Sequence, residues 1–205
     1  MSGRIAIATE DELSEAVAVR IVQVAAPGLI VASTFRRDGF GYLRKSMERF
    51  CGMAPHLPVL LLTDLDKSDC APSLIRTWLG PRSKPREFLF RVAVRETEAW
   101  LLADHDAMAK LFGRRDPKLP EDPDALSDPK AALIRLARKA PRSMRTEIAP
   151  EPGAAASQGL GYNAVLCRFV REHWDPVRAA VRSNSLRRAL DCVARFAARA
   201  SRSGE

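Results

Sequence analysis

The first half of the chain alternates short apolar runs with longer stretches in which apolar residues recur every three or four positions. The runs lie at Arg4–Ala8, Leu29–Ser33, Val59–Thr63 and Phe88–Val94. Each is too short for a typical helix and is bounded by polar or turn-forming residues, as buried strands of a parallel sheet are. Repeating strand–helix units of this size predict a parallel α/β sheet with right-handed crossovers.

The stretches between the runs predict helices. Thr9 and Glu12 fit a capping box at the start of the first helix. That helix ends at about Ala25 and has its apolar positions at Leu13, Val17, Ile21 and Val24. Further helices are expected at Tyr42–Phe50, at Ser73–Leu79 with Pro72 at the first helical position, and from Arg95 onward.

The second half of the chain predicts helices without strands. Gly113–Lys130 is rich in proline and acidic residues and predicts a surface loop or insertion. Helices are expected after Asp128-Pro129, over Tyr162 to about Val181 with a break at Asp175-Pro176, and over Ser185 to about Ala200. We therefore expect an α/β core at residues 1–112, with a loop and a basic helical extension at 113–205 packed on it.

Bulk composition excludes several classes of protein. With 205 residues and 46% hydrophobic residues, the chain can form a core. No apolar run reaches the roughly 18 residues of a membrane span, and no signal peptide is evident, so we expect a cytoplasmic protein. Its four cysteines are far apart and form no C-x-x-C pair, which favours free thiols over disulfides or a zinc site.

The charge is unevenly distributed along the chain. The formal net charge is +8, and residues 142–205 hold 11 arginines, no lysine and six acidic residues, which is +5 of that total. A basic extension permits binding to DNA or RNA, and Arg187 and Arg188 on its last helix are the candidate contacts. An arginine-rich outer helix face also occurs as a purely solvated surface.

Acidic residues follow two of the predicted strands. Asp64 and Asp66 come directly after Val59–Thr63, and Glu10 follows the first strand. Side chains two residues apart in an extended segment point the same way, and ligands of parallel sheets collect at the carboxyl ends of strands. Clustered carboxylates suit a hard cation, so we predict a Mg²⁺ (or Mn²⁺) site. The alternative is that these acids cap turns and helices.

More candidates follow the fourth strand. Glu96 and Glu98 come after Phe88–Val94, and helix geometry places only one of them toward a cleft. We assign Glu96 as a candidate metal ligand and Glu98 as a candidate catalytic acid, with helix-start acids as the alternative. Arg95 and Lys67 are candidates for neutralising phosphate oxygens.

This combination resembles the Toprim domain of topoisomerases, primases and OLD-family nucleases over about residues 4–105. In that family a glutamate after strand one and a D-x-D after strand three form the Mg²⁺ site, here Glu10, Asp64 and Asp66. The R-E-x-E-A-W-L-L-A-D stretch (Arg95–Asp104), the D-P-K at 128–130 and the G-Y at 161–162 resemble the uncharacterised bacterial DUF4276 family, which is treated as Toprim-like. The resemblance implies a Toprim-like (Rossmannoid), mostly parallel sheet flanked by helices.

Two functions follow. The first is a Mg²⁺-dependent nuclease with Glu10, Asp64, Asp66 and Glu98 as catalytic residues. The resemblance implies a role in defence against phage or plasmids with a separate ATPase, because this chain has no P-loop. The second is a non-catalytic module that binds nucleic acid or a protein. The tyrosines have no context typical of a topoisomerase nucleophile, which disfavours strand passage.

Overall fold

The computed structural model describes residues 3–36, 41–113, 118–151 and 153–202. Within these ranges, four parallel strands form one sheet in the order β2-β1-β3-β4, as the apolar runs predicted. The strands are β1 (Gly3–Thr9), β2 (Leu29–Arg36), β3 (Val59–Asp64) and β4 (Phe88–Ala93). The central pair, β1 and β3, brings the end of the first strand beside the end of the third.

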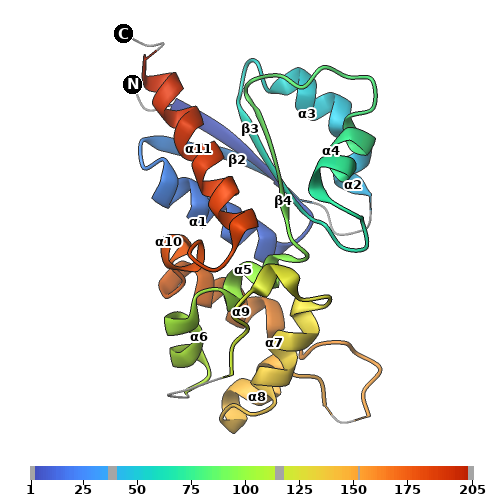
Figure 1. Ribbon diagram of the computed structural model, residues 1–205, viewed down its shortest axis with the longest axis vertical. Helices are drawn as coiled ribbons and strands as arrows, with labels where there is room; N and C mark the ends of the chain where they lie inside the picture. The colour runs from blue at the N-terminus through green and yellow to red at the C-terminus, as the bar shows by residue number, and fades with distance from the viewer. Residues whose placement is uncertain (1–2, 37–40, 114–117, 152, 203–205) are drawn as a thin grey trace.

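Successive side chains of a strand point to opposite faces of the sheet, so the strands contribute to two separate apolar cores. Ile5, Ile7, Leu60 and Leu62 join one apolar cluster, which contains α1 (Glu12–Ala25) and α11 (Asn184–Arg202). The alternate residues of the same strands join the other cluster, which contains α2 (Tyr42–Lys45), α3 (Met47–Met53) and α4 (Ala71–Leu79). They include Ala6, Ala8, Val59 and Leu61. Helices therefore cover both faces of the sheet (Figure 1), which explains why the strands read as continuous apolar runs.

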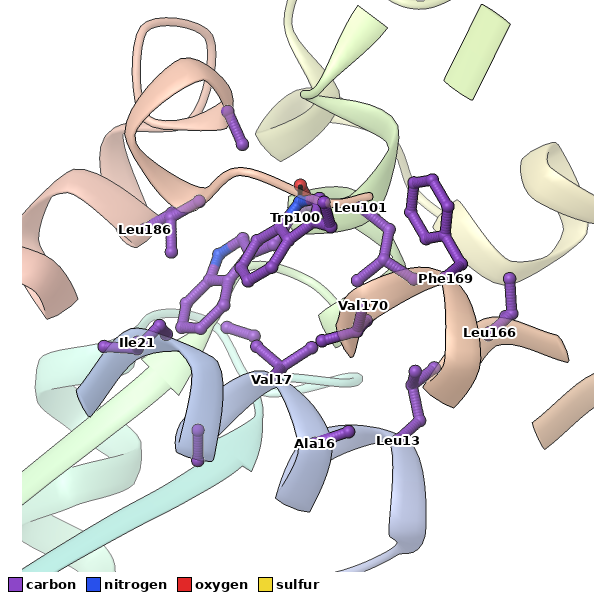
Figure 2. Packing of buried hydrophobic residues seen from close by; sticks show 14 of the residues in the cluster. Leu13, Ala16, Val17, Ile21, Trp100, Leu101, Leu166, Phe169, Val170 and Leu186 are labelled. Carbon is purple, nitrogen blue, oxygen red and sulfur yellow. Dashed lines mark hydrogen bonds between the residues drawn. The ribbon is translucent and has the colours of Figure 1, made fainter. Parts of the chain in front are cut away.

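The larger core continues into the helical half of the chain. Figure 2 shows Leu13, Val17 and Ile21 of α1 packed around Trp100 and Leu101 of α5 (Thr97–Leu102), together with side chains of α9 (Tyr162–Glu172) and α11. Every residue of α5 is buried. One apolar cluster thus spans both predicted parts of the chain. The boundary predicted at residue 112 remains a prediction.

Short helices complete the second half. They are α6 (His105–Leu111), the 3₁₀ turn η1 (Pro123–Ala125), α7 (Pro129–Ala137), α8 (Arg142–Ile148) and α10 (Pro176–Ala179). Asp128 caps α7, as predicted from the Asp128-Pro129 pair. The break predicted at Asp175-Pro176 separates α9 from α10, and Asp175 caps α10. No helix among the described residues is long and apolar enough to cross a membrane.

Several local predictions were wrong. The capping box of α1 is formed by Asp11 and Ser14, because the strand runs through Thr9 and the helix begins two residues later than that pair requires. The helix expected at Tyr42–Phe50 is split at Ser46 into α2 and α3. Cys70 is the N-cap of α4, so Pro72 is its second helical residue. Asp104 caps α6 and thereby ends the helix predicted from Arg95.

Asp104 also joins α6 to α10, and its loss should destabilise the protein. It is 1% exposed and accepts from Arg178 Nε (3.0 Å), Arg178 Nη2 (2.8 Å) and the Asp175 backbone N–H (2.8 Å). We expect Asp104→Ala to lower the free energy of unfolding by about 2–4 kcal/mol, because a cap and a charge-assisted network disappear together. Urea unfolding measures this. The exposed control Arg168→Ala should change stability by less than about 0.5 kcal/mol, and an equal effect of both variants would refute the assignment.

Candidate functional site

A pocket of about 810 Å³ lies at the carboxyl ends of the central strands. Glu10 follows β1, Asp64 ends β3, and Asp66 and Lys67 follow in the next turn. Glu96, beyond β4, lines the same pocket. The parallel order of the sheet therefore brings together acids that lie far apart in the sequence, as the strand assignments predicted.

Glu10 is held by the strand beside its own. The hydroxyl group of Thr63, a buried residue of β3, donates to Oε1 of Glu10. Oε2 of Glu10 makes no hydrogen bond to any residue that the structure describes. Burial raises the pKa of Glu10, the Thr63 hydrogen bond lowers it, and nearby Asp66 raises it. One oxygen is thus oriented by the sheet while the other remains available.

Asp64 is held in the same manner by α5. Its Oδ1 accepts from the Thr97 backbone N–H (2.9 Å) and from the Thr97 hydroxyl group (2.8 Å). Oδ2 has no hydrogen-bond partner in the described part of the chain. Burial, followed by repulsion from Glu98, raises the pKa of Asp64 well above its usual range. Asp64 therefore caps a distant helix through one oxygen, which is a different role from the turn cap considered from sequence.

Asp66 lines the pocket from a turn, and not from the extended segment that the sequence had predicted. The strand ends at Asp64, and Asp66 lies in a turn with φ 48°, so the rule for residues two apart in an extended segment does not apply. Asp and Asn are the residue types enriched in this left-handed region. Arg95 holds the turn by donating from Nη1 to the backbone oxygens of Asp66 (2.9 Å) and Ser68 (3.0 Å). In this geometry Arg95 supports the loop as well as lining the pocket.

Glu96 faces the pocket and Glu98 does not line it. Glu96 Oε2 accepts from the Lys130 backbone N–H (2.8 Å) at the start of α7. Burial raises the pKa of Glu96, the bond from Lys130 lowers it, and Glu98 then raises it. Its position supports Glu96 as the outward-facing member of the pair.

Glu98 is 6% exposed and lies close enough to Asp64 for its charge to raise the pKa of Asp64. The Tyr162 hydroxyl group donates to its Oε1 (2.7 Å), and the Lys130 ammonium lies 5.1 Å from the centroid of the Tyr162 ring. Burial raises the pKa of Glu98, while the Tyr162 hydrogen bond lowers it. Burial also raises the pKa of Tyr162, as does the adjacent Glu98. A direct catalytic role for Glu98 stays a prediction.

The donor chemistry fits a hard divalent cation. The pocket offers carboxylate oxygens from Glu10, Asp64, Asp66 and Glu96, and ligands of this kind suit Mg²⁺ or Mn²⁺. Burial is the main cause of the raised pKa values of Glu10, Asp64 and Glu96, and repulsion from Asp66 adds to it, which a cation would relieve. Among the described residues, however, no three His, Cys, Asp or Glu side chains are already arranged around a common metal position. The acids are neighbours in one pocket and do not form a preassembled ligand set.

The predicted nucleic-acid contacts fall in two places. Arg95 and Lys67 line the same pocket as Glu10, Asp64, Asp66 and Glu96, which we call the carboxylate pocket. Arg187 and Arg188 of α11 line a second pocket of about 830 Å³, which we call the basic groove. Arg91 of the outer strand β4 and Arg182 line that groove with them, and the Nε of Arg91 is buried with no hydrogen-bond partner in the described chain. Three acidic residues, Glu121, Asp122 and Asp124, line the same groove, so its four arginines leave it only slightly basic.

Thr63, Thr97 and Tyr162 orient the acids, and sequence reasoning did not find them as functional residues. Each acts on a carboxylate from a different part of the chain, so local spacing contains no signal for it. Asp128, which lines the pocket and caps α7, was recognised only as a cap. The G-Y at 161–162 and the D-P-K at 128–130 marked Tyr162 and Lys130 only as parts of a resemblance and did not indicate that either residue acts on Glu98.

Comparisons with known proteins do not show a family for this chain. No family model matches it, and a search of the curated proteins finds no match. Among solved structures, the chain is similar to the C-terminal region of the Burkholderia pseudomallei OLD protein, with 13% sequence identity and a TM-score of 0.49. That similarity covers 96% of this chain and 100% of the other. At this level it carries no argument about activity, and the DUF4276 assignment remains a resemblance.

The raised pKa values predict how stability depends on pH. A carboxyl group with a higher pKa in the folded than in the unfolded protein adds stability below its unfolded pKa, and this is lost as pH rises through its folded pKa. Without divalent metal, we expect the unfolding free energy contributed by Glu10, Asp64, Glu96 and Glu98 to fall above about pH 4.5.

Asp64→Asn should reduce this fall and raise Tm at neutral pH, because the amide oxygen can still accept from Thr97 without ionising. Thermal unfolding between about pH 5 and pH 8 in EDTA measures the effect. Asp191→Asn, at an exposed position of α11, is the control and should follow the wild-type curve. A steeper fall for Asp64→Asn than for wild type would contradict the electrostatic assignment.

Proposed function

We propose that this protein is a Mg²⁺- or Mn²⁺-dependent phosphodiesterase of the Toprim type that acts on nucleic acid. One observation carries the proposal. Glu10 and Asp64, from adjacent strand ends, each have one carboxylate oxygen fixed by a threonine and the other oxygen without a partner among the described residues. Glu10 and Asp64 also line one pocket together with Asp66 and Glu96. Roles as helix caps or buried acceptors alone would not explain why four acids share a pocket.

The residues of the pocket divide into two roles. Glu10, Asp64 and Asp66 would hold the cation, with Glu96 as a further oxygen donor. A bound divalent cation activates a water molecule and neutralises charge on a phosphoryl group. Lys67, whose ammonium has no partner in the described chain, is placed to attract phosphate oxygens, while Arg95 keeps the Asp66 turn in position. Tyr162 and Thr97 act from outside the pocket by fixing Glu98 and Asp64.

A second candidate function is a non-catalytic module that binds nucleic acid or protein. The absence of a preassembled three-ligand group among the described residues favours this function. The basic groove, with Arg182, Arg187 and Arg188, gives such a module a surface for a polyanion. An ATPase that works with this chain would have to supply its own P-loop, since residues 1–205 contain none. A role in defence belongs to the first proposal only.

Metal binding separates the two functions. We expect wild-type protein to bind Mg²⁺ or Mn²⁺ in calorimetry and to hydrolyse nucleic acid, and Asp64→Asn combined with Asp66→Asn to lose both. The reduction in turnover should be at least about 100-fold, because these oxygens hold the metal that carries the chemistry. Asp106→Asn, at an exposed acid of α6, is the matched control. No binding by wild type at millimolar metal, with or without nucleic acid, would exclude the catalytic function.

Charge reversal tests the basic groove. Arg187→Glu with Arg188→Glu should weaken nucleic-acid binding and lower the slope of log K against log salt by about two, because two phosphate contacts are lost. Arg142→Glu with Arg145→Glu makes the same charge change at exposed positions of α8, a helix that does not line the groove. Affinity measured by fluorescence anisotropy at several salt concentrations gives the slope. Equal slopes for the two double variants would show that the groove makes no specific contribution.

A further inference from the structure

One wall of the carboxylate pocket, formed by α4, has a chemistry that metal binding does not explain. Helix α4 presents Ser73, Leu74, Thr77 and Trp78 to the pocket, two pairs of residues four positions apart and therefore on one helix face. The hydroxyl groups of Ser73 and Thr77 make no hydrogen bond to another described residue. This wall thus combines an aromatic ring with unpaired hydroxyl groups.

Trp78 is the most informative residue of the wall. One part of its indole ring packs on Phe90 of β4, with ring centroids 5.6 Å apart, and another part borders the pocket. Its indole N–H has no acceptor within the described ranges. By contrast, Trp100 and Trp174 are 0% exposed, and their N–H groups donate to Ser185 Oγ (2.6 Å) and to the Trp100 backbone oxygen (3.1 Å). Trp78 alone among the three tryptophans is placed to contact a ligand.

Cations line the same pocket as the aromatic wall and the acids. Arg44 of α2 and Lys67 line the pocket, and neither side chain has a hydrogen-bond or ion-pair partner in the described chain. The pocket therefore offers a metal-binding end for a phosphate, cations for the adjoining phosphates, and an aromatic ring with hydroxyl groups for a flat heterocycle. A volume of about 810 Å³ accommodates more than one nucleotide.

We propose that this pocket takes nucleic acid with an unpaired base, which stacks on Trp78 while its neighbouring phosphodiester lies at Glu10, Asp64 and Asp66. Since it names the form of the substrate, this inference rests on the proposed function. A base inside a duplex has both faces covered and its edges paired, so it reaches Trp78 only after leaving the stack. Single strands, frayed ends and flipped-out bases meet the requirement, whereas intact duplex does not.

Tryptophan fluorescence provides a test that does not depend on hydrolysis. The probe is a single-stranded oligothymidylate of about ten nucleotides, compared with a blunt duplex of equal length, both in Ca²⁺ in place of Mg²⁺. We expect the single strand to quench the accessible fluorescence and to bind at least about 10-fold more tightly than the duplex. Trp78→Phe should abolish the quenching signal, because the remaining tryptophans are buried, and should retain most of the affinity by anisotropy.

Removal of the ring gives the decisive comparison. Trp78→Ala should weaken single-strand binding by roughly 5- to 150-fold and leave duplex binding unchanged. Arg76→Ala, at an exposed position of the same helix outside the pocket, should match wild type. Equal affinity of wild type for both probes overturns the inference. So does unaltered single-strand affinity of a Trp78→Ala protein whose circular dichroism matches wild type.

The same experiment keeps this inference separate from the proposed function. Hydrolysis of both probes in Mg²⁺ at equal rates, without quenching in Ca²⁺, would overturn the base site and leave the phosphodiesterase intact. Selective quenching by the single strand, with no hydrolysis in Mg²⁺ or Mn²⁺ and no metal binding, would support the base site and overturn the catalytic proposal. In that case the pocket belongs to a module that binds single-stranded nucleic acid.

Discussion

The N–H groups at the starts of helices are the constraint on which this structure depends. The first N–H groups of a helix have no acceptor within that helix, so they need acceptors from elsewhere. Here carboxylates from elsewhere in the chain supply them. Asp64 accepts from the first residue of α5, Glu96 from Lys130 in α7, and Asp124 from Ser185 at the start of α11. These contacts fix the helical half against the sheet and fix the acids at one edge of it.

That arrangement explains how a site can form from residues that also stabilise the fold. A carboxylate has two oxygens, and a helix start needs only one of them. In Asp64 and Glu96, one oxygen holds a helix and the other has no partner among the described residues. Side chains anchored in this way lose little further freedom when they bind a ligand. Burial, and after it repulsion from Glu98, raises the pKa values of Asp64 and Glu96, which is the electrostatic cost of holding carboxylates in such positions.

The strands and most helices could be predicted because their signals are local. Apolar runs and helical spacing depend on neighbouring residues, and so do the Asp-Pro caps of α7 and α10. The candidate ligands were found because an acid at the end of a parallel strand has a defined place in such folds. The start of α1 was placed wrongly because Thr9 and Asp11 both suit an N-cap, and only the length of β1 decides between them. Thr63, Thr97 and Tyr162 could not be recognised, since their roles exist only after distant segments meet.

The position of α11 has a consequence for how this chain folds. The last helix that the structure describes packs against α1 and β1, the first elements of the chain, and shares one apolar cluster with them. During synthesis the N-terminal strand and helix therefore emerge long before the surface that covers them. Contacts between distant ends of a chain slow folding and expose apolar surface in the meantime. The apolar surface of α1 and β1 that α11 covers therefore stays exposed until α11 has been synthesised.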